Sequence, residues 1–166
     1  MLQEADRSAQ DTAAIVDAVR AQNVQIMALK PNSDAGSTGV REVLEARAAA
    51  GEIRLATHLP RPDFVSWLAA CDVLVGNSSS GIIEAASFGT PVVNVGSRQN
   101  LRQRNANVFD CSVQRADLDA ALGRALASTR SDGYNVYGDG KAGERIAGLL
   151  ADIDPAAASI AKTNVY

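Results

Sequence analysis

The stretch VGNSSSGIIE, residues 75–84, decides the fold because the periodicity of the chain changes within it. Before the serines lies the apolar run 73–75, which is apolar on both faces, as in a strand buried inside a sheet. After them, GIIEAASFG (81–89) has the spacing of a helix closed by a glycine, and PVVNVG (91–96) predicts the next strand. A strand, a polar turn, a helix and a second strand form the repeating unit of a parallel sheet.

The rest of the chain continues this alternation. Short apolar runs separated by amphipathic segments predict a parallel sheet with helices on both faces, which is a doubly wound α/β domain. The expected helices cover residues 10–22, 39–51, 62–70 and 81–89, with two more around 118–126 and 142–153. The expected strands cover residues 24–30, 53–59, 71–77, 91–96 and 107–113.

Composition limits the chain to one domain and excludes two classes of partner. With 166 residues, 46% of them hydrophobic and 21% charged, the chain can bury one ordinary core. The formal net charge of -3 and the scattered Lys and Arg residues argue against a nucleic-acid partner. No apolar run approaches the roughly 20 residues that cross a bilayer, and the N-terminus MLQEADRSAQ has no signal-peptide pattern. We therefore expect no membrane partner and a cytoplasmic location.

Neither cysteine is expected to take part in chemistry. Cys71 and Cys111 lie in apolar surroundings, which predicts small core residues rather than a disulfide framework. The single histidine, His58, is not near either of them in sequence. We expect no bound metal and no cofactor.

The serines lie where a parallel sheet binds its ligands. Ligands bind beyond the carboxyl ends of the strands, where a helix start offers unpaired N–H groups and the positive end of its dipole. Ser78, Ser79 and Ser80 can cap the helix and donate hydroxyl hydrogen bonds to an anion, while Gly76 and Gly81 allow close backbone approach. The turn contains no lysine and lacks the spacing of a P-loop, so it predicts a phosphate site of another kind.

Glu84 extends the predicted site. It follows Ser80 by four residues, hence on the same helical face and about 6 Å further along the axis. That offset suits a ribose attached to a diphosphate, because a carboxylate can accept hydrogen bonds from both ribose hydroxyls. An alternative explains the same residues: serines before a helix commonly serve as N-caps, and a glutamate in the first turns complements the dipole.

A second polar loop, GSRQNLRQRN (96–105), follows the next predicted strand. Because parallel strands end at the same edge of a sheet, we expect the loop beside the serines, where guanidinium groups can hold phosphate oxygens. The side chains concerned are Arg98, Gln99, Arg102 and Arg104. The alternative is a solvated surface loop, but two polar loops at one edge favour a binding site.

Three motifs, PNSDAGS (31–37), GNSSSGIIEAASFGTPVVNVGSRQNLR (76–102) and YGDGKAGERI (137–146), carry a resemblance to a known family. In this order they resemble the C-terminal domain of the UDP-N-acetylglucosamine 2-epimerases, particularly the hydrolysing branch that begins sialic acid synthesis. The resemblance covers most of residues 24–153. It implies a glycosyltransferase-B fold, in which two Rossmann-like domains hold the nucleotide sugar in the cleft between them. This chain resembles the second domain.

The resemblance implies roles for the matching side chains of the second motif. Ser78 and Ser79 match the diphosphate-binding serines of the family. Glu84 matches its ribose-binding carboxylate, and Arg98 matches an arginine of the UDP site. These roles agree with the interpretation of the residues themselves.

Two further residues belong to the edge of the implied cleft. Asn32, in the first motif, matches a residue that lines the cleft, and Asp34 and Ser37 would shape its loop. His58 belongs to THLPRPDF (57–64), where the fold receives the uracil, although a lone loop histidine is also an ordinary surface residue.

The resemblance also implies what the chain lacks. The catalytic acids and bases of the family belong to its N-terminal domain, and no residue here matches them. We therefore expect a chain that is inactive alone, with the missing N-terminal domain as partner and a homodimer as a candidate assembly. The family's domain begins with a strand ending in His-Pro, and this sequence starts just beyond that point. A truncated gene product with an unpaired sheet edge is the expectation.

The implied function is the UDP-binding half of a UDP-N-acetylglucosamine 2-epimerase. Residues 1–153 would form the nucleotide-binding half-domain, with UDP or UDP-N-acetylglucosamine as ligand, and residues 154–166 would form a tail. The whole enzyme would release UDP, add water and invert C2, giving N-acetylmannosamine. A stand-alone nucleotide-sugar-binding module and half of a related glycosyltransferase are the alternatives. The motifs PNSDAGS and GSRQ favour the epimerase over the glycosyltransferase.

Overall fold

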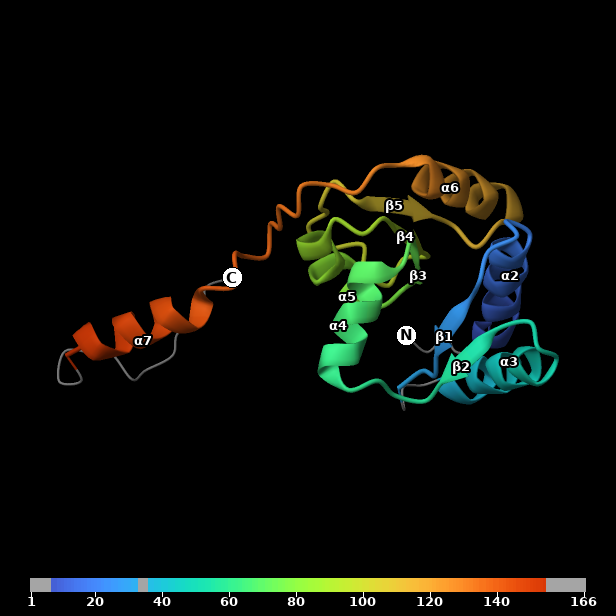
Figure 1. The fold of residues 1–166 in the computed structure, drawn as a ribbon, viewed down its shortest axis with the longest axis horizontal. Helices are drawn as coiled ribbons and strands as arrows, with labels where there is room; N and C mark the ends of the chain where they lie inside the picture. The colour runs from blue at the N-terminus through green and yellow to red at the C-terminus, as the bar shows by residue number, and fades with distance from the viewer. Residues whose placement is uncertain (1–6, 33–35, 155–166) are drawn as a thin grey trace.

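The computed structural model describes residues 7–32 and 36–154, and it confirms the predicted α/β alternation (Figure 1). The strand pairs of the described residues are parallel, and the strands are shorter than their apolar runs. The elements in chain order are α2 (Ser8–Arg20), β1 (Met27–Leu29), α3 (Ser37–Ala49), β2 (Arg54–Ala56), α4 (Arg61–Ala70), β3 (Leu74–Gly76), α5 (Ser79–Ile83), η1 (Ala85–Phe88), β4 (Val92–Val95), β5 (Val108–Cys111), α6 (Arg115–Ala127) and α7 (Ala142–Asp152).

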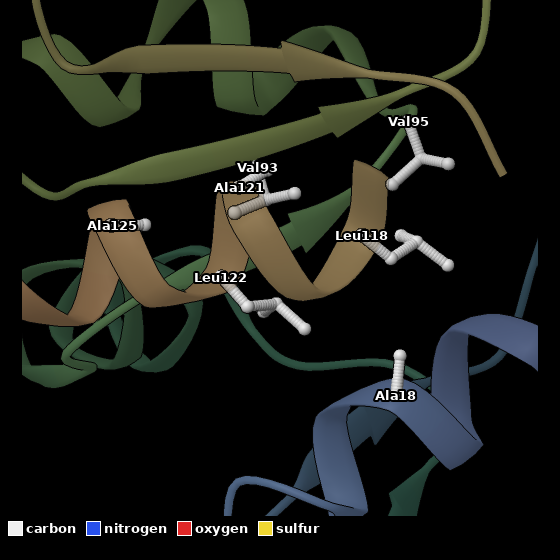
Figure 2. Close-up of a cluster of buried hydrophobic side chains, with 7 residues drawn as sticks. All are labelled: Ala18, Val93, Val95, Leu118, Ala121, Leu122 and Ala125. Atoms are coloured by element: carbon white, nitrogen blue, oxygen red, sulfur yellow. The ribbon is translucent and has the colours of Figure 1, made fainter. Parts of the chain in front are cut away.

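β4 is buried on both faces, as a central strand of a doubly wound sheet must be. Val93 and Val95 belong to an apolar cluster with side chains of α6 (Figure 2), whereas Val92 packs with Leu68 of α4 and Ala85 of η1. Successive side chains of a strand point to opposite faces, which explains why neighbouring valines enter different clusters. The prediction from the run PVVNVG is confirmed.

The strands form two separately hydrogen-bonded groups. β1 pairs with β2, so that Met27 lies opposite Arg54. β3, β4 and β5 form the second group, in which Val92 lies between Leu74 and Val108. Sequence analysis predicted a single sheet that lacks one strand, and the structure has two parallel ladders in place of one continuous ladder.

α2 joins the two groups through side chains. Val16 packs with Leu44 and Ile53 beside β1 and β2, while Ala18 packs with Leu118 and the second group (Figure 2). Residues two apart on a helix point about 200° away from each other, so α2 can bury both faces at once. This packing holds the two ladders in one body.

Among residues 7–32 and 36–154, each group has an edge whose backbone polar groups pair with no other strand. In a parallel ladder, alternate residues of a strand direct their N–H and C=O groups toward the same neighbouring strand. The N–H of Lys30 donates to β2 at 2.9 Å, so the polar groups of Leu29 point away from β2. The N–H of Leu74 donates to the residue before β4 at 2.9 Å, so those of Val75 point away from β4. Neither β1 nor β3 contains the proline or lysine that blunts exposed edges.

The segment after α6 first makes hydrogen bonds to the α/β body and then extends away from it. Arg130, Asn135 and Tyr137 each donate to a backbone carbonyl distant in sequence, at 2.7, 2.7 and 2.9 Å. Beyond them α7 extends away from the body (Figure 1). The predicted helix is confirmed, but it buries none of its residues. The large apolar side chains of α7 and of its C-cap are 52–72% exposed: Ile146, Leu149, Leu150 and Ile153. Of the predicted tail, only Asp154 lies inside the described residues.

The two cysteines, Cys71 and Cys111, are free thiols. Both are half-buried rather than fully buried, at the end of α4 and in β5. Burial raises the pKa of both thiols, and the thiolate is the reactive form. The structure therefore gives neither cysteine the environment of a nucleophile.

Gly81 brings α5 against the sheet, and this contact can be tested. A Cβ at Gly81 would lie 2.9 Å from Val92 Cγ1 and 3.4 Å from Leu74 Cδ2. Gly81→Ala should therefore lower the free energy of unfolding by about 1–3 kcal/mol through overpacking. Gly123→Ala is the control, because Gly123 in α6 has nothing within 4 Å and alanine should stabilise that helix by about 0.5–1 kcal/mol. Urea titrations followed by circular dichroism measure both, and a Gly81→Ala protein as stable as wild type would contradict the contact.

Candidate functional site

The serine turn, residues 77–80, lies at the carboxyl end of β3, as predicted. Ser78 is the N-cap of α5: it has extended dihedrals, and its Oγ accepts a hydrogen bond of 3.4 Å from the N–H of Ser80. The hydroxyls of Ser78 and Ser80 lie 2.9 Å apart and bond to each other. Ser79 is exposed, and its hydroxyl has no partner among the described residues. The turn thus presents one uncommitted hydroxyl beside a bonded pair.

The helix after the turn differs from the predicted one. The expected helix over 81–89 begins two residues earlier, at Ser79, is α-helical only to Ile83 and continues as the 3-10 helix η1 to Phe88. Gly89 ends it with a φ of +62°, as predicted. A five-residue helix has a small dipole, so anion binding here would rest mainly on hydroxyl and N–H donors.

The two glycines of the turn have different surroundings. Sequence analysis gave both the task of letting a ligand approach the backbone, but Gly81 is buried and its close neighbours are Val92 and Leu74. Gly76 has a φ of +148°, which favours glycine, and open space around it. A small hollow of about 30 Å³ lies here, lined by Leu74, Val75, Gly76, Ser78, Gly81 and Val92. Of the two, Gly76 has the open surroundings that the predicted role requires.

Glu84 lies one helical turn beyond the serines. Its N–H donates to the carbonyl of Ser80 at 2.9 Å, which is the predicted spacing of four residues. Its carboxylate accepts a hydrogen bond from the guanidinium of Arg61, the first residue of α4, and its side chain is 30% exposed. Arg61 also lies over the ring of Phe64, 5.8 Å from its centroid. The segment THLPRPDF therefore does reach the predicted site, through an arginine that sequence analysis did not single out.

The loop after β4 touches the serine turn through Gln99. The Nε2 of Gln99 donates to the carbonyl of Asn77 at 2.8 Å, and the side chain is buried. The prediction that the two polar loops lie side by side is confirmed by this contact. Arg98 and Arg102 are exposed at the same loop.

Arg104 was predicted as a phosphate-binding side chain, and the structure corrects this. Its Nε donates to Asp110 at 2.9 Å, and its NH1 donates to the carbonyl of Gln99 at 2.7 Å. Asn94 donates to the same carboxylate at 2.6 Å. Burial raises the pKa of Asp110, but the hydrogen bonds from Arg104 and Asn94 and the charge of Arg104 outweigh it and hold the pKa below its ordinary value. Arg104 is therefore committed to an ion pair with Asp110, whose side chain is half exposed.

Asn32 and His58 belong to the other strand group. Asn32 follows β1 and His58 follows β2, so both lie at carboxyl ends of strands, and both are exposed. Within the described residues, no hydrogen bond or ion pair connects either of them to the serine turn. Asp34, the residue expected to shape the loop of Asn32, lies outside the described residues.

The arrangement suits an anion next to a diol. Hydroxyl and backbone donors come from the serine turn, a carboxylate from Glu84 and a positive charge from Arg98.

In residues 7–32 and 36–154, no group of three or more His, Cys, Asp or Glu could hold a metal ion. No helix of the same residues is long and apolar enough to cross a membrane. A larger hollow of about 430 Å³ lies elsewhere, between residues 133–139 and Arg145 at the base of α7.

Comparison with known sequences matches the family described as UDP-N-acetylglucosamine 2-epimerase over residues 2–151. UDP-N,N'-diacetylbacillosamine 2-epimerase (hydrolyzing) of Legionella pneumophila is 44% identical over 166 residues, which is 100% of this chain and 44% of the relative. GDP/UDP-N,N'-diacetylbacillosamine 2-epimerase (hydrolyzing) of Campylobacter jejuni is 31% identical over 103 residues, 61% of this chain and 26% of the relative. The chain thus spans less than half the length of these relatives.

Solved structures share the fold. UDP-GlcNAc 2-epimerase of Methanocaldococcus jannaschii has a TM-score of 0.69 at 15% identity, covering 91% of this chain and 43% of that one. The same archaeal enzyme in complex with UDP-GlcNAc and UDP has a TM-score of 0.63 at 13% identity, covering 83% and 38%. The predicted resemblance is confirmed: the chain belongs to the UDP-N-acetylglucosamine 2-epimerase family.

Proposed function

We propose that the chain forms the UDP-binding half of a hydrolysing UDP-N-acetylglucosamine 2-epimerase. The observation that carries the proposal is the serine turn at the carboxyl end of β3, with Glu84 one helical turn beyond Ser80. A nucleoside diphosphate has an anion and a diol at about this offset, which match the hydroxyl and N–H donors and the carboxylate. Family membership and the archaeal complex with UDP-GlcNAc and UDP support the same ligand.

The proposal gives each site residue a task. The diphosphate binds at the hydroxyls of Ser78, Ser79 and Ser80, of which that of Ser79 has no partner among the described residues. Glu84 accepts the ribose hydroxyls on the oxygen that Arg61 leaves open, because Arg61 bonds to Oε2 alone. Arg98 adds positive charge for the phosphates, and the exposed Asn32 and His58 line the edge of the cleft toward sugar and base.

The sugar has a second candidate. The relatives from Legionella pneumophila and Campylobacter jejuni are named for UDP-N,N'-diacetylbacillosamine and GDP/UDP-N,N'-diacetylbacillosamine. Both names contain a diacetamido sugar rather than N-acetylglucosamine. Both reactions release UDP by hydrolysis at the same end of the ligand, so the proposed roles of the serine turn and Glu84 are unchanged. A diacetamido sugar is therefore the alternative substrate of the complete enzyme.

A second half completes the proposed enzyme. We assign residues 1–153 to the nucleotide-binding half-domain and residues 154–166 to a tail, and the other half supplies the catalytic acid and base. Two features support a partner of this kind: the open edges of β1 and β3, and the exposed apolar side chains of α7, which extends away from the body (Figure 1). The relatives are more than twice as long as this chain, which is enough for one further domain.

The purified chain should bind UDP weakly, because half of the cleft is absent. We expect a dissociation constant in the high micromolar range or weaker, which is a binding free energy of roughly -5 kcal/mol or less favourable.

Glu84→Gln should lower the affinity for UDP about tenfold or more, since charge-assisted hydrogen bonds are lost. Its stability should change little, because an exposed ion pair contributes at most about 1 kcal/mol. Titration calorimetry at millimolar UDP measures this, with Glu144→Gln in α7 as the matched control. The absence of heat from a folded sample would remove the nucleotide site.

Substitution of Ser78 and of Ser79 by alanine should distinguish helix capping from phosphate binding. Ser78→Ala removes the N-cap and should lower the free energy of unfolding by about 0.5–1 kcal/mol. Ser79→Ala should leave stability unchanged and should weaken UDP more than uridine, because its hydroxyl is free to reach a phosphate. The ratio of UDP to uridine affinity, determined by NMR titration, decides this. If Ser79→Ala leaves the ratio at the wild-type value, the hydroxyl has no part in phosphate binding.

The chain alone should not turn over a nucleotide sugar. Binding UDP without a positioned acid and base leaves the barrier at C2 unchanged. Chromatography of UDP-N-acetylglucosamine incubated with the purified chain should therefore show no UDP above the buffer control. Release of UDP by the chain without a partner would show that its own residues perform the chemistry.

A further inference from the structure

We propose that Gln99 is the positioning residue of the serine turn, an inference that rests on the function proposed above. Its Nε2 donates to the carbonyl of Asn77 at 2.8 Å, across 22 positions of sequence. The side chain is 4% exposed, so water does not compete for this hydrogen bond. The bond holds the residue immediately before the N-cap Ser78, and it therefore sets where the following hydroxyls lie.

Gln99 is itself held in place from the sheet. Its backbone carbonyl accepts from NH1 of Arg104 at 2.7 Å, and the Nε and NH2 of Arg104 bond to Asp110 of β5. The carboxylate of Asp110 also accepts from Nδ2 of Asn94, at 2.6 Å. Asn94 is only 1% exposed in β4. A continuous chain of hydrogen bonds thus runs from the core of the sheet to Asn77.

The serine turn has few restraints of its own. Gly76 enters it with a φ of +148°, and the helix that follows has only five residues. Its local side-chain bonds join Ser78 and Ser80 to each other, at 2.9 and 3.4 Å, rather than to the sheet. Because a glycine before the turn leaves the backbone free to rotate, the hydrogen bond from Gln99 is the contact that, within the described part of the chain, ties Asn77 to a distant segment.

The carbonyl oxygen of the Gln99 side chain makes it possible to test the positioning of the turn separately from the stability of the fold. Its Oε1 is buried and has no hydrogen-bonding partner among the described residues. A buried carbonyl oxygen without a partner is destabilising, so an apolar side chain of similar length would remove a penalty together with the bond to Asn77. Methionine has that length and no amide. Gln99→Met should therefore change stability little while it releases the turn.

The experiment compares Gln99→Met with wild type and with Gln103→Met, a matched change at an exposed glutamine of the same loop. We expect Gln99→Met to lower UDP affinity about threefold to tenfold, the loss of one hydrogen bond, with uridine affinity unchanged. In the ligand-free protein, NMR relaxation should show greater mobility of the amides of residues 77–81 only in Gln99→Met. Gln99→Asn, whose shorter side chain cannot reach Asn77, should behave in the same way if Gln99→Met does not fold.

Two results would overturn the inference. One is a folded Gln99→Met protein whose UDP and uridine affinities fall together or stay at wild-type values. The other is unchanged mobility of residues 77–81 in the ligand-free variant. If wild type itself binds no UDP, the proposed function fails, and the relaxation measurement alone then decides whether Gln99 positions the turn.

Discussion

α2 packs against both strand groups and holds them in one body. No ladder of backbone hydrogen bonds joins β1 and β2 to the other described strands, so side chains must hold the two groups together. Val16 and Ala18 do so from opposite sides of one helix. Asn32 and His58 belong to one group and the serine turn to the other, and the relative position of the proposed site residues therefore depends on this helix.

The order and type of the elements could be predicted from sequence, because apolar runs and helical spacing are local properties. The break of the helix after Ile83 could not, since GIIEAASFG has the same apolar spacing in an α-helix as in an α-helix followed by a 3-10 turn. The position of α7 was also outside the reach of sequence. A helical apolar face, here with Leu149 and Leu150, indicates that a partner is needed but not which element provides it.

The placement of the candidate side chains could be predicted where chemistry and local spacing coincide, as at the serines and Glu84. The long-range pairs of the site could not be predicted, because nothing in the local sequence indicates which distant groups meet: Arg61 with Glu84, and Gln99 with Asn77. Arg104 shows the opposite error, in which a charged loop residue was expected at the ligand and instead bonds to Asp110. The same types of residue contact a ligand or hold a loop in place. Only the contacts that each side chain makes in the structure distinguish the two roles.

The proposed binding of UDP at the serine turn is tested most directly by a map of amide chemical-shift changes in the 15N-labelled chain on addition of UDP. We expect changes centred on residues 77–84 and on Arg98, with smaller ones near Asn32 and His58. Changes confined to the larger hollow at residues 133–139 and Arg145, with the serine turn unaffected, would contradict the proposed binding.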